Sequence, residues 1–315
     1  MIEYLKICRI DHWLKNIFIL FGHAVAIVLV PSVVLDAISV GIIIFSLIPA
    51  CFIASANYIL NEILDAPFDR LHPTKKNRGI PAGKVKVSIL WWIFAGLIVA
   101  GFALAIPFKS PGYLIALGLL LLSGLVYNIP PVRLKDRVFL DVIAESFNNP
   151  IRLWLGWFAL VPSLDVWPPL PIVFAWWSFG ALLMTGKRYA EFRFIDDKEL
   201  SGKYRKSFQD YSEQKLIIAM ITYANFFCFF TGVAMTAYQK LNNLVFVFPM
   251  IALAIIAYFR QAMSIKGAKL EPEQLMRNVW VIAATIITAV LALWLLGAEN
   301  FTQKFSFWAK DWMAE

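Results

Sequence analysis

Long apolar runs recur along the whole chain, and they constrain its fold more than any other feature. Each run is close to the length that a helix needs to cross roughly 30 Å of hydrocarbon. Backbone groups in lipid must be hydrogen-bonded internally, and these runs lack the alternation of barrel strands, so we predict α-helices. The sequence therefore predicts an all-α polytopic membrane protein with nine transmembrane helices, near residues 16–34, 38–60, 87–107, 112–128, 138–160, 169–186, 216–237, 244–259 and 279–297.

Composition supports the same class of protein. Of the 315 residues, 60% are hydrophobic and only 16% are charged, which is far from the balance of a water-soluble domain. No soluble domain or linker interrupts the pattern, and we expect a single domain over residues 1–315. The net charge of +8 could indicate a nucleic acid partner. We expect none, because in a membrane protein the position of basic residues relative to the spans is what matters.

The basic residues are distributed asymmetrically between the connections. If the N-terminus is cytoplasmic, most of the 29 Lys and Arg residues fall on the cytoplasmic side, whereas Lys109, Lys240, Lys304 and Lys310 fall on the other. The positive-inside rule then predicts an integral protein of the cell membrane with its N-terminus inside and its C-terminus outside. The long inward loops after the second and sixth runs hold most acids and bases, so we expect function there.

The strongest chemical signal lies at the inward end of the second run. Asn61, Asp65 and Asp69 are spaced by four, which on a helix places three oxygen-bearing side chains on one face, roughly 6 Å apart. Mg²⁺ prefers a few carboxylates together with phosphate oxygens, and Lys75 and Arg78 just downstream could neutralise a diphosphate. The alternative is a solvated loop with ordinary surface ion pairs, which does not explain the stripe.

The fifth run carries polar residues that are unusual in a membrane span, namely Asp141, Glu145, Asn148, Asn149 and Arg152. Ionisable groups in a bilayer are costly and normally face a bundle interior or a wet cavity. We therefore interpret Glu145, Asn149 and Arg152 as substrate-binding candidates. A polar network that merely holds helices together is the alternative.

The pattern Asn-x-x-x-Asp-x-x-x-Asp-Arg-x-His-Pro-Thr-Lys-Lys-x-Arg, which begins at Asn61, resembles the first aspartate-rich motif of the UbiA superfamily of intramembrane prenyltransferases. The resemblance implies nine helices around a central cavity that opens to the cytoplasm. It also implies that diphosphate substrates bind through Mg²⁺ and two acidic motifs. In that family, Asp65 and Asp69 would be catalytic and, with Asn61, would bind the metal.

Two further segments match the family in part. Residues 127–135 follow the fourth run and resemble a basic loop, in which Arg133 and Lys135 would bind phosphate oxygens. A positive-inside loop without a substrate role is the alternative. After the sixth run, Glu191, Asp196 and Asp197 stand where the second acidic motif is expected, but their spacing departs from the usual one. The resemblance implies that Glu191 is catalytic and that all three are candidate metal ligands.

The departure indicates one branch of the superfamily. Residues 187–191 resemble the polyprenyl-phosphate phosphoribosyltransferases, such as decaprenyl-phosphate phosphoribosyltransferase, and residues 9–16 resemble the opening of the same branch. Anchoring at the membrane interface is the alternative for the opening segment. The resemblance implies five more substrate-binding residues, which are Lys15, Asn16, Lys187, Arg188 and Tyr189.

These observations predict magnesium-dependent transfer of 5-phosphoribose from phosphoribosyl diphosphate to a polyprenyl phosphate. An anionic phosphate acceptor needs little help from a general base. The expected partners are a polyprenyl lipid, a diphosphate-containing substrate and the bilayer, and the oligomeric state stays open. One alternative is prenyl transfer from a polyprenyl diphosphate to an aromatic or other small acceptor. Another is a transporter, in which Glu145 and Arg152 would line the pathway.

Overall fold

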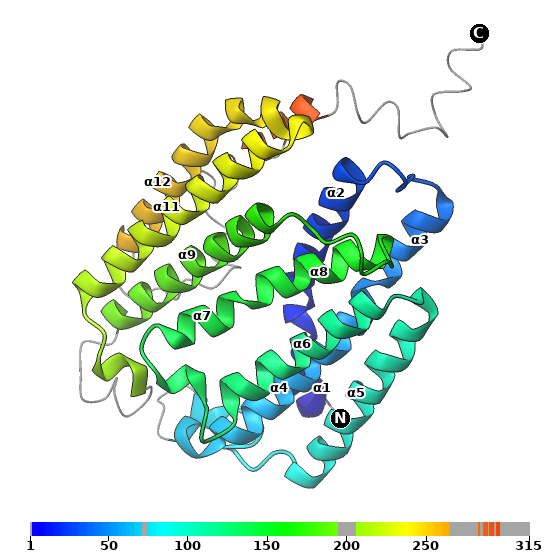
Figure 1. Cartoon of the computed structure of the whole chain (residues 1–315). Helices are drawn as coiled ribbons and strands as arrows, with labels where there is room; N and C mark the ends of the chain where they lie inside the picture. Colours follow the sequence, from blue (N-terminus) through cyan, green and yellow to red (C-terminus); the bar gives the residue numbers. More distant parts are fainter. Residues whose placement is uncertain are drawn as a thin grey trace. The chain divides into compact units, whose positions relative to one another are not determined.

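The computed structural model describes residues 2–70, 75–194 and 206–264, together with some helical residues between 283 and 296. Every regular element in these ranges is a helix, which confirms the all-α prediction (Figure 1). By length and composition, seven helical segments among the described residues could cross a membrane. They match seven of the nine predicted runs.

The remaining two runs are not among these seven segments. The fifth run, 138–160, is two shorter helices, α7 (Leu140–Ser146) and α8 (Asn148–Leu160). Proline has no backbone N–H and clashes with the preceding turn, so Pro150 interrupts the helix at Phe147, close to one turn before it. The ninth run, 279–297, lies largely outside the described residues, and the count of nine spans stays a prediction.

The described chain groups into two compact units. The first comprises residues 1–26, 37–168 and 202–207, and the second comprises 27–36, 169–201 and 208–315. The single domain expected from the sequence stays a prediction. The elements of the first unit are α1 (Ile2–Cys8), η1 (Ile10–Phe18), the start of α2 (Ile19–Leu29), α3 (Ala37–Phe45), α4 (Leu47–Asp69), η2 (Lys75–Asn77), α5 (Val87–Ala105), η3 (Ile106–Phe108), α6 (Pro111–Asn128), η4 (Leu134–Asp136), α7 and α8.

Helix α4 lies at the centre of the packing in the first unit, with α1, η1, α5 and α6 against it (Figure 1). Small side chains such as Ala50 and Ala56 are fully buried on α4 and allow its neighbours to approach closely. The indole N–H of Trp13 donates to Ser55 Oγ at 2.8 Å and so holds η1 on α4. The first span therefore begins near Glu3, earlier than the predicted residue 16, because the N-terminal segment packs on α4.

Helices α2 and α8 of the first unit approach each other backbone to backbone. A Cβ added at Gly156 would lie 2.1 Å from the carbonyl oxygen of Ile19, and a Cβ added at Gly22 would lie 2.1 Å from that of Leu153. Neither contact is possible for a larger residue without movement of the backbone, and glycine is the residue that permits such an approach. This contact sets the position of α8 relative to the N-terminal segment.

The elements of the second unit are α9 (Leu170–Phe194), α11 (Glu213–Ala237), η6 (Gln239–Val247) and α12 (Phe248–Ser264), with the short η5 (Lys206–Gln209) at its boundary with the first unit. Helices α9 and α11 pack side by side through aromatic pairs, including Phe174 stacked on Phe230 with ring centroids 5.2 Å apart. Helix α12 also contacts α9, where Tyr258 donates to the carbonyl oxygen of Leu183 at 2.8 Å. Gly186 makes room for this tyrosine.

Candidate functional site

The predicted stripe of Asn61, Asp65 and Asp69 lies on the last three turns of α4. The helix continues through Pro67 and ends at Asp69, so all three side chains keep the spacing of one helical face. Asp69 is buried, whereas Asn61 and Asp65 are half-buried. The stripe therefore runs from the apolar part of the helix towards its polar end.

The basic loop after α6 reaches this stripe. The ammonium group of Lys135 donates to Asn61 Oδ1 at 3.1 Å, to Asn128 Oδ1 at 2.9 Å and to Asp65 Oδ1. Arg133 adds a guanidinium, whose Nη2 donates to Asp65 Oδ1 at 3.0 Å. The structure thus brings together four residues that the sequence assigned to metal and phosphate binding, and it adds Asn128, which the sequence did not identify.

A second ion-pair group surrounds the end of α4. Arg78 Nη1 lies 3.0 Å from Asp69 Oδ2 and 3.6 Å from Glu62 Oε2, and Arg9 Nη2 lies 3.9 Å from the same Glu62 oxygen. Glu62 is buried and is absent from the predicted site. Glu62 directly follows Asn61 and so does not fall on the four-residue spacing that defined the stripe. Consecutive helix residues point about 100° apart, which places Glu62 on a different face. The signal available in the sequence was an acidic residue within an apolar run. The side chain of Lys75 lies outside the described residues.

The oxygen atoms around Lys135 can hold a cation. Three of them, on Asn61, Asp65 and Asn128, already surround a positive ammonium. Among the described residues no group of three Asp, Glu, His or Cys side chains forms a metal site by itself. Mg²⁺ is usually bound by one or two carboxylates together with substrate phosphate oxygens, so this donor set is suited to it. Asp196 and Asp197 lie outside the described residues.

The polar face of the fifth run forms a separate cluster in the first unit. Arg152 Nε donates to Asn16 Oδ1 at 3.1 Å, and Arg152 Nη1 donates to the carbonyl oxygen of Asn148 at 3.4 Å. Tyr127 donates to Glu145 Oε2 at 3.3 Å. The structure thus brings Asn16 and Arg152 together across 136 residues of sequence. Two other predicted residues lie on adjacent positions, with Lys15 half-buried in η1 and Asn149 buried in α8.

The remaining predicted residues lie on α9 in the second unit. Arg188 is buried, and its Nη1 donates to Glu191 Oε2 at 2.9 Å. Tyr189 donates to Glu213 Oε1 at 2.8 Å. Lys187 precedes them on the same helix. A neighbouring arginine on the same helix is thus one partner of Glu191, and the role of Glu191 as a metal ligand stays a prediction.

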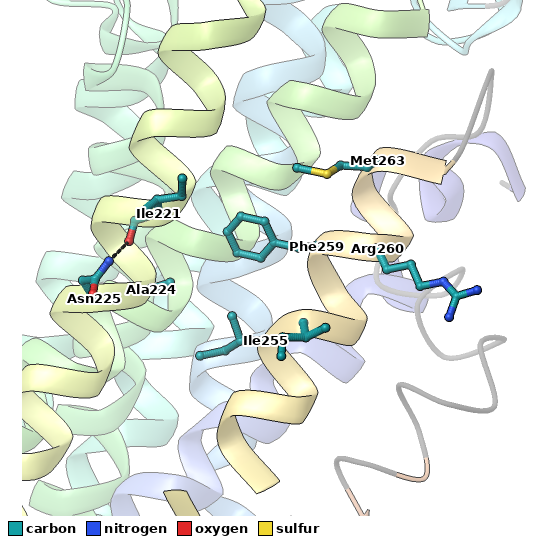
Figure 2. A pocket seen from close by; sticks show the side chains of 8 residues that line it. Ile221, Ala224, Asn225, Ile255, Phe259, Arg260 and Met263 are labelled. Carbon is teal, nitrogen blue, oxygen red and sulfur yellow. Dashed lines mark hydrogen bonds between the residues drawn. The ribbon is translucent and has the colours of Figure 1, made fainter. Parts of the chain in front are cut away.

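An apolar groove of about 720 Å³ lies between α11 and α12 in the second unit (Figure 2). Phe259 points towards α11, whereas Arg260 extends away from it, and Asn225 donates to the carbonyl oxygen of Ile221 at 2.8 Å. The lining is otherwise aliphatic, which is typical of surfaces that contact lipid chains. The lining residues are Ile221, Ala224, Asn225, Ile255, Ile256, Phe259, Arg260 and Met263.

These observations describe an α-helical membrane protein in which acidic and basic side chains gather at the end of one apolar helix. Residues 17–282 match the UbiA prenyltransferase family, and this chain belongs to that family. The family expected from the motif at Asn61 is therefore confirmed. With its apolar helices, this membership makes the chain an integral membrane protein.

Two curated relatives carry the same name. The chain is 29% identical over 217 residues to the decaprenyl-phosphate phosphoribosyltransferase of Mycolicibacterium smegmatis, in a match that covers 67% of this chain and 63% of the relative. It is 30% identical over 216 residues to the protein of that name from Mycobacterium tuberculosis, covering 67% and 66%. The match thus spans just under two thirds of the length of these relatives. The branch predicted from residues 187–191 is represented among the similar proteins.

Solved structures share the fold. A UbiA homolog from Archaeoglobus fulgidus bound to DMAPP and Mg²⁺ superimposes with a TM-score of 0.68, at 16% identity, over 94% of this chain and 99% of that one. Such low identity shows the fold alone.

Proposed function

We propose that this protein transfers 5-phosphoribose from phosphoribosyl diphosphate to a polyprenyl phosphate, with Mg²⁺ as its metal ion. One observation carries the proposal: Arg133 and Lys135 converge with Asn61 and Asp65 at one end of an apolar helix. Oxygen ligands and phosphate-binding cations are the two halves of a site for a metal-bound diphosphate. Similarity to two decaprenyl-phosphate phosphoribosyltransferases supports the choice of substrates.

The acidic and amide residues and the basic residues of the proposed site have different roles. Asn61, Asp65 and Asp69 would hold Mg²⁺, with Glu191, Asp196 and Asp197 as further acidic ligands. Mg²⁺ held by these residues would supply positive charge to offset that of the leaving diphosphate. Arg133, Lys135, Lys75 and Arg78 would donate hydrogen bonds to phosphate oxygens, and such charge-assisted bonds are the strong ones.

The transfer itself is a substitution at the anomeric carbon. An oxygen of the acceptor phosphate forms a bond to C1 of the ribose. The bond between C1 and the diphosphate oxygen breaks, and its electron pair leaves with the diphosphate. The acceptor oxygen is already anionic, so no proton has to be removed. The chain contributes by orienting the diphosphate and by stabilising its developing charge through Arg133 and Lys135.

The proposed site also implies how the protein is oriented in the membrane. The reaction would take place in a central cavity open to the cytoplasm, within a bundle of nine helices formed by a single domain. The N-terminus and the loops after α4 and α9 would be cytoplasmic, in the cell membrane, because these segments are rich in lysine and arginine. The polyprenyl tail would lie in a groove between helices.

A second candidate is prenyl transfer from a polyprenyl diphosphate to a small acceptor. The A. fulgidus homolog of the same fold was solved with DMAPP and Mg²⁺, and the same site could hold a prenyl diphosphate with the roles of lipid and headgroup exchanged.

Product analysis separates these reactions. Purified full-length protein is given labelled phosphoribosyl diphosphate with polyprenyl phosphate, and in parallel polyprenyl diphosphate with aromatic acids, each with Mg²⁺ or with a chelator. We expect a phosphoribosylated lipid from the first pair only, and only with Mg²⁺. A prenylated aromatic product would favour the second candidate, and no metal-dependent product from any pair would favour a transporter.

A further inference from the structure

Arg152 is the one charged residue of α8. Its described hydrogen-bond partners are both neutral. Its Nε donates to the side chain of Asn16, and its Nη1 donates to the backbone oxygen of Asn148. A guanidinium has five N–H donors, so these two bonds leave others available. Among the described residues, the hydrogen-bond partners of Arg152 are thus an amide oxygen and a backbone carbonyl, and neither carries a negative charge.

Such a charge needs compensation. Placing an ionised group in an apolar environment without an opposite charge costs far more than placing a neutral one. The Arg152 side chain is only partly buried, so part of the guanidinium-bearing chain stays accessible. An ionisable residue within a membrane span is a candidate functional residue by default.

The partners of Arg152 are themselves held in place. Asn16 is buried and donates through Nδ2 to Cys51 Sγ at 3.2 Å. Ser123 Oγ donates to Asn148 Oδ1 at 2.7 Å. The close approach of α2 and α8 at Gly156, one turn along α8 from Arg152, fixes both helices. The guanidinium is thus oriented before any ligand arrives, which is the property of a preorganised binding group.

This cluster lies apart from the proposed diphosphate site but is connected to it through α4. Asn57 Nδ2 donates to the carbonyl oxygen of Leu120 at 2.8 Å, and Ser123 Oγ lies 2.8 Å from the same oxygen. Asn57 precedes Asp65 by eight residues, which is about 12 Å along a helix axis. Arg152 is a second positive centre in the same unit, and its partners, Asn16 and Asn148, differ from the Asn61, Asp65 and Asn128 side chains that meet Arg133 and Lys135.

We propose that Arg152, with Asn16 and Asn148, forms a second anion subsite that binds a phosphate monoester. This inference rests on the proposed function, because that reaction brings two such groups in addition to the diphosphate. One is the 5-phosphate of the donor and the other is the phosphate of the lipid acceptor. Both have the same charge and the same oxygen acceptors, so the chemistry of the subsite is the same for either source.

Direct binding measurements test the subsite without relying on turnover. Full-length protein in nanodiscs is titrated separately with ribose 5-phosphate, with farnesyl phosphate and with inorganic diphosphate plus Mg²⁺. For the R152Q variant we expect the dissociation constant of at least one monophosphate to rise roughly tenfold or more. Diphosphate binding should stay within about twofold of wild type, since that site lacks Arg152. The monophosphate that loses affinity identifies the source.

The N16D variant distinguishes an anion site from a structural bond. It places a carboxylate where Asn16 Oδ1 accepts from Arg152, so the guanidinium keeps a partner but loses its excess charge. We expect this variant to melt at or above the wild-type temperature and to lose monophosphate affinity as R152Q does, whereas R152K should keep part of it. The inference is wrong if wild type binds neither monophosphate, or if N16D binds both as wild type does. A wild type that binds a monophosphate through Arg152 but makes no phosphoribosyl lipid would overturn only the proposed reaction.

Discussion

Gly22 on α2 and Gly156 on α8 face each other so closely that a Cβ built on Gly156 would lie 2.9 Å from the Cα of Gly22. Each glycine lies against the backbone of the other helix, and the contact is a turn or two from Asn16 and Arg152. The pair therefore links the packing of two helices to the position of a polar cluster. Substitution of either glycine should therefore disturb both the packing of α2 on α8 and the position of the polar cluster.

We expect G156A to lower the free energy of unfolding by about 1–3 kcal/mol, because the added methyl group overpacks a backbone contact. The variant should also bind phosphate monoesters more weakly, since Asn16 and Arg152 would shift apart. Thermal unfolding in detergent measures the first effect. The matched control is G118A on α6, where an added Cβ meets nothing within 4 Å. Equal stability of G156A and G118A would contradict the close approach.

Replacement of Asp65 by Asn should reduce transfer on the order of 100-fold or more while the protein stays folded and inserted, because the carboxylate is the charged ligand of the proposed metal site. The amide is of similar size and can still accept hydrogen bonds from Arg133 and Lys135. The assay compares product formation over a series of Mg²⁺ concentrations. D165N changes an exposed acid whose described side-chain partner is Ser163, and it serves as the control. Wild-type activity in D65N would rule out the assignment.

Lys135→Met removes the ammonium that three oxygen atoms surround, and we expect the Mg²⁺-diphosphate complex to bind roughly tenfold more weakly. The KM for the diphosphate substrate should rise more than the KM for the acceptor. Titration of inorganic diphosphate with Mg²⁺ provides an independent measurement. Lys86→Met removes an exposed lysine at the start of α5 and should leave both values unchanged. A purely structural role for Lys135 would instead lower the melting temperature without a change in diphosphate affinity.

Glu145→Gln should alter substrate affinity more than stability. The amide oxygen can still accept the hydrogen bond from Tyr127, so the contact between α6 and α7 is kept while the charge is lost. KM values and the melting temperature are measured together, and Y127F shows how much the hydrogen bond itself contributes. A large loss of stability with unchanged kinetics would indicate that Glu145 holds helices together.

Local patterns determined what could be predicted about the elements. Apolar runs of sufficient length predicted the spans because a helix in lipid satisfies its own backbone. The spacing of Asn61, Asp65 and Asp69 predicted a shared face, because the helical period is a local property. The same reasoning missed the interruption at Phe147, where the polar residues and Pro150 lie inside a run that is apolar on average. It also missed Glu62, which lies beside the stripe and not on it.

The sequence by itself determined the helical membrane fold, the acidic stripe of α4 and the family, because each depends on a pattern of residues that are close together in the chain. Only the tertiary structure decided which cation meets which oxygen. Lys135 and Asp65 are 70 residues apart in sequence, and Arg152 and Asn16 are 136 apart. Such pairs depend on how closely helices pack, and that depends on the absence of side chains at positions such as Gly22 and Gly156. A glycine in a sequence does not reveal which backbone will occupy the space it leaves.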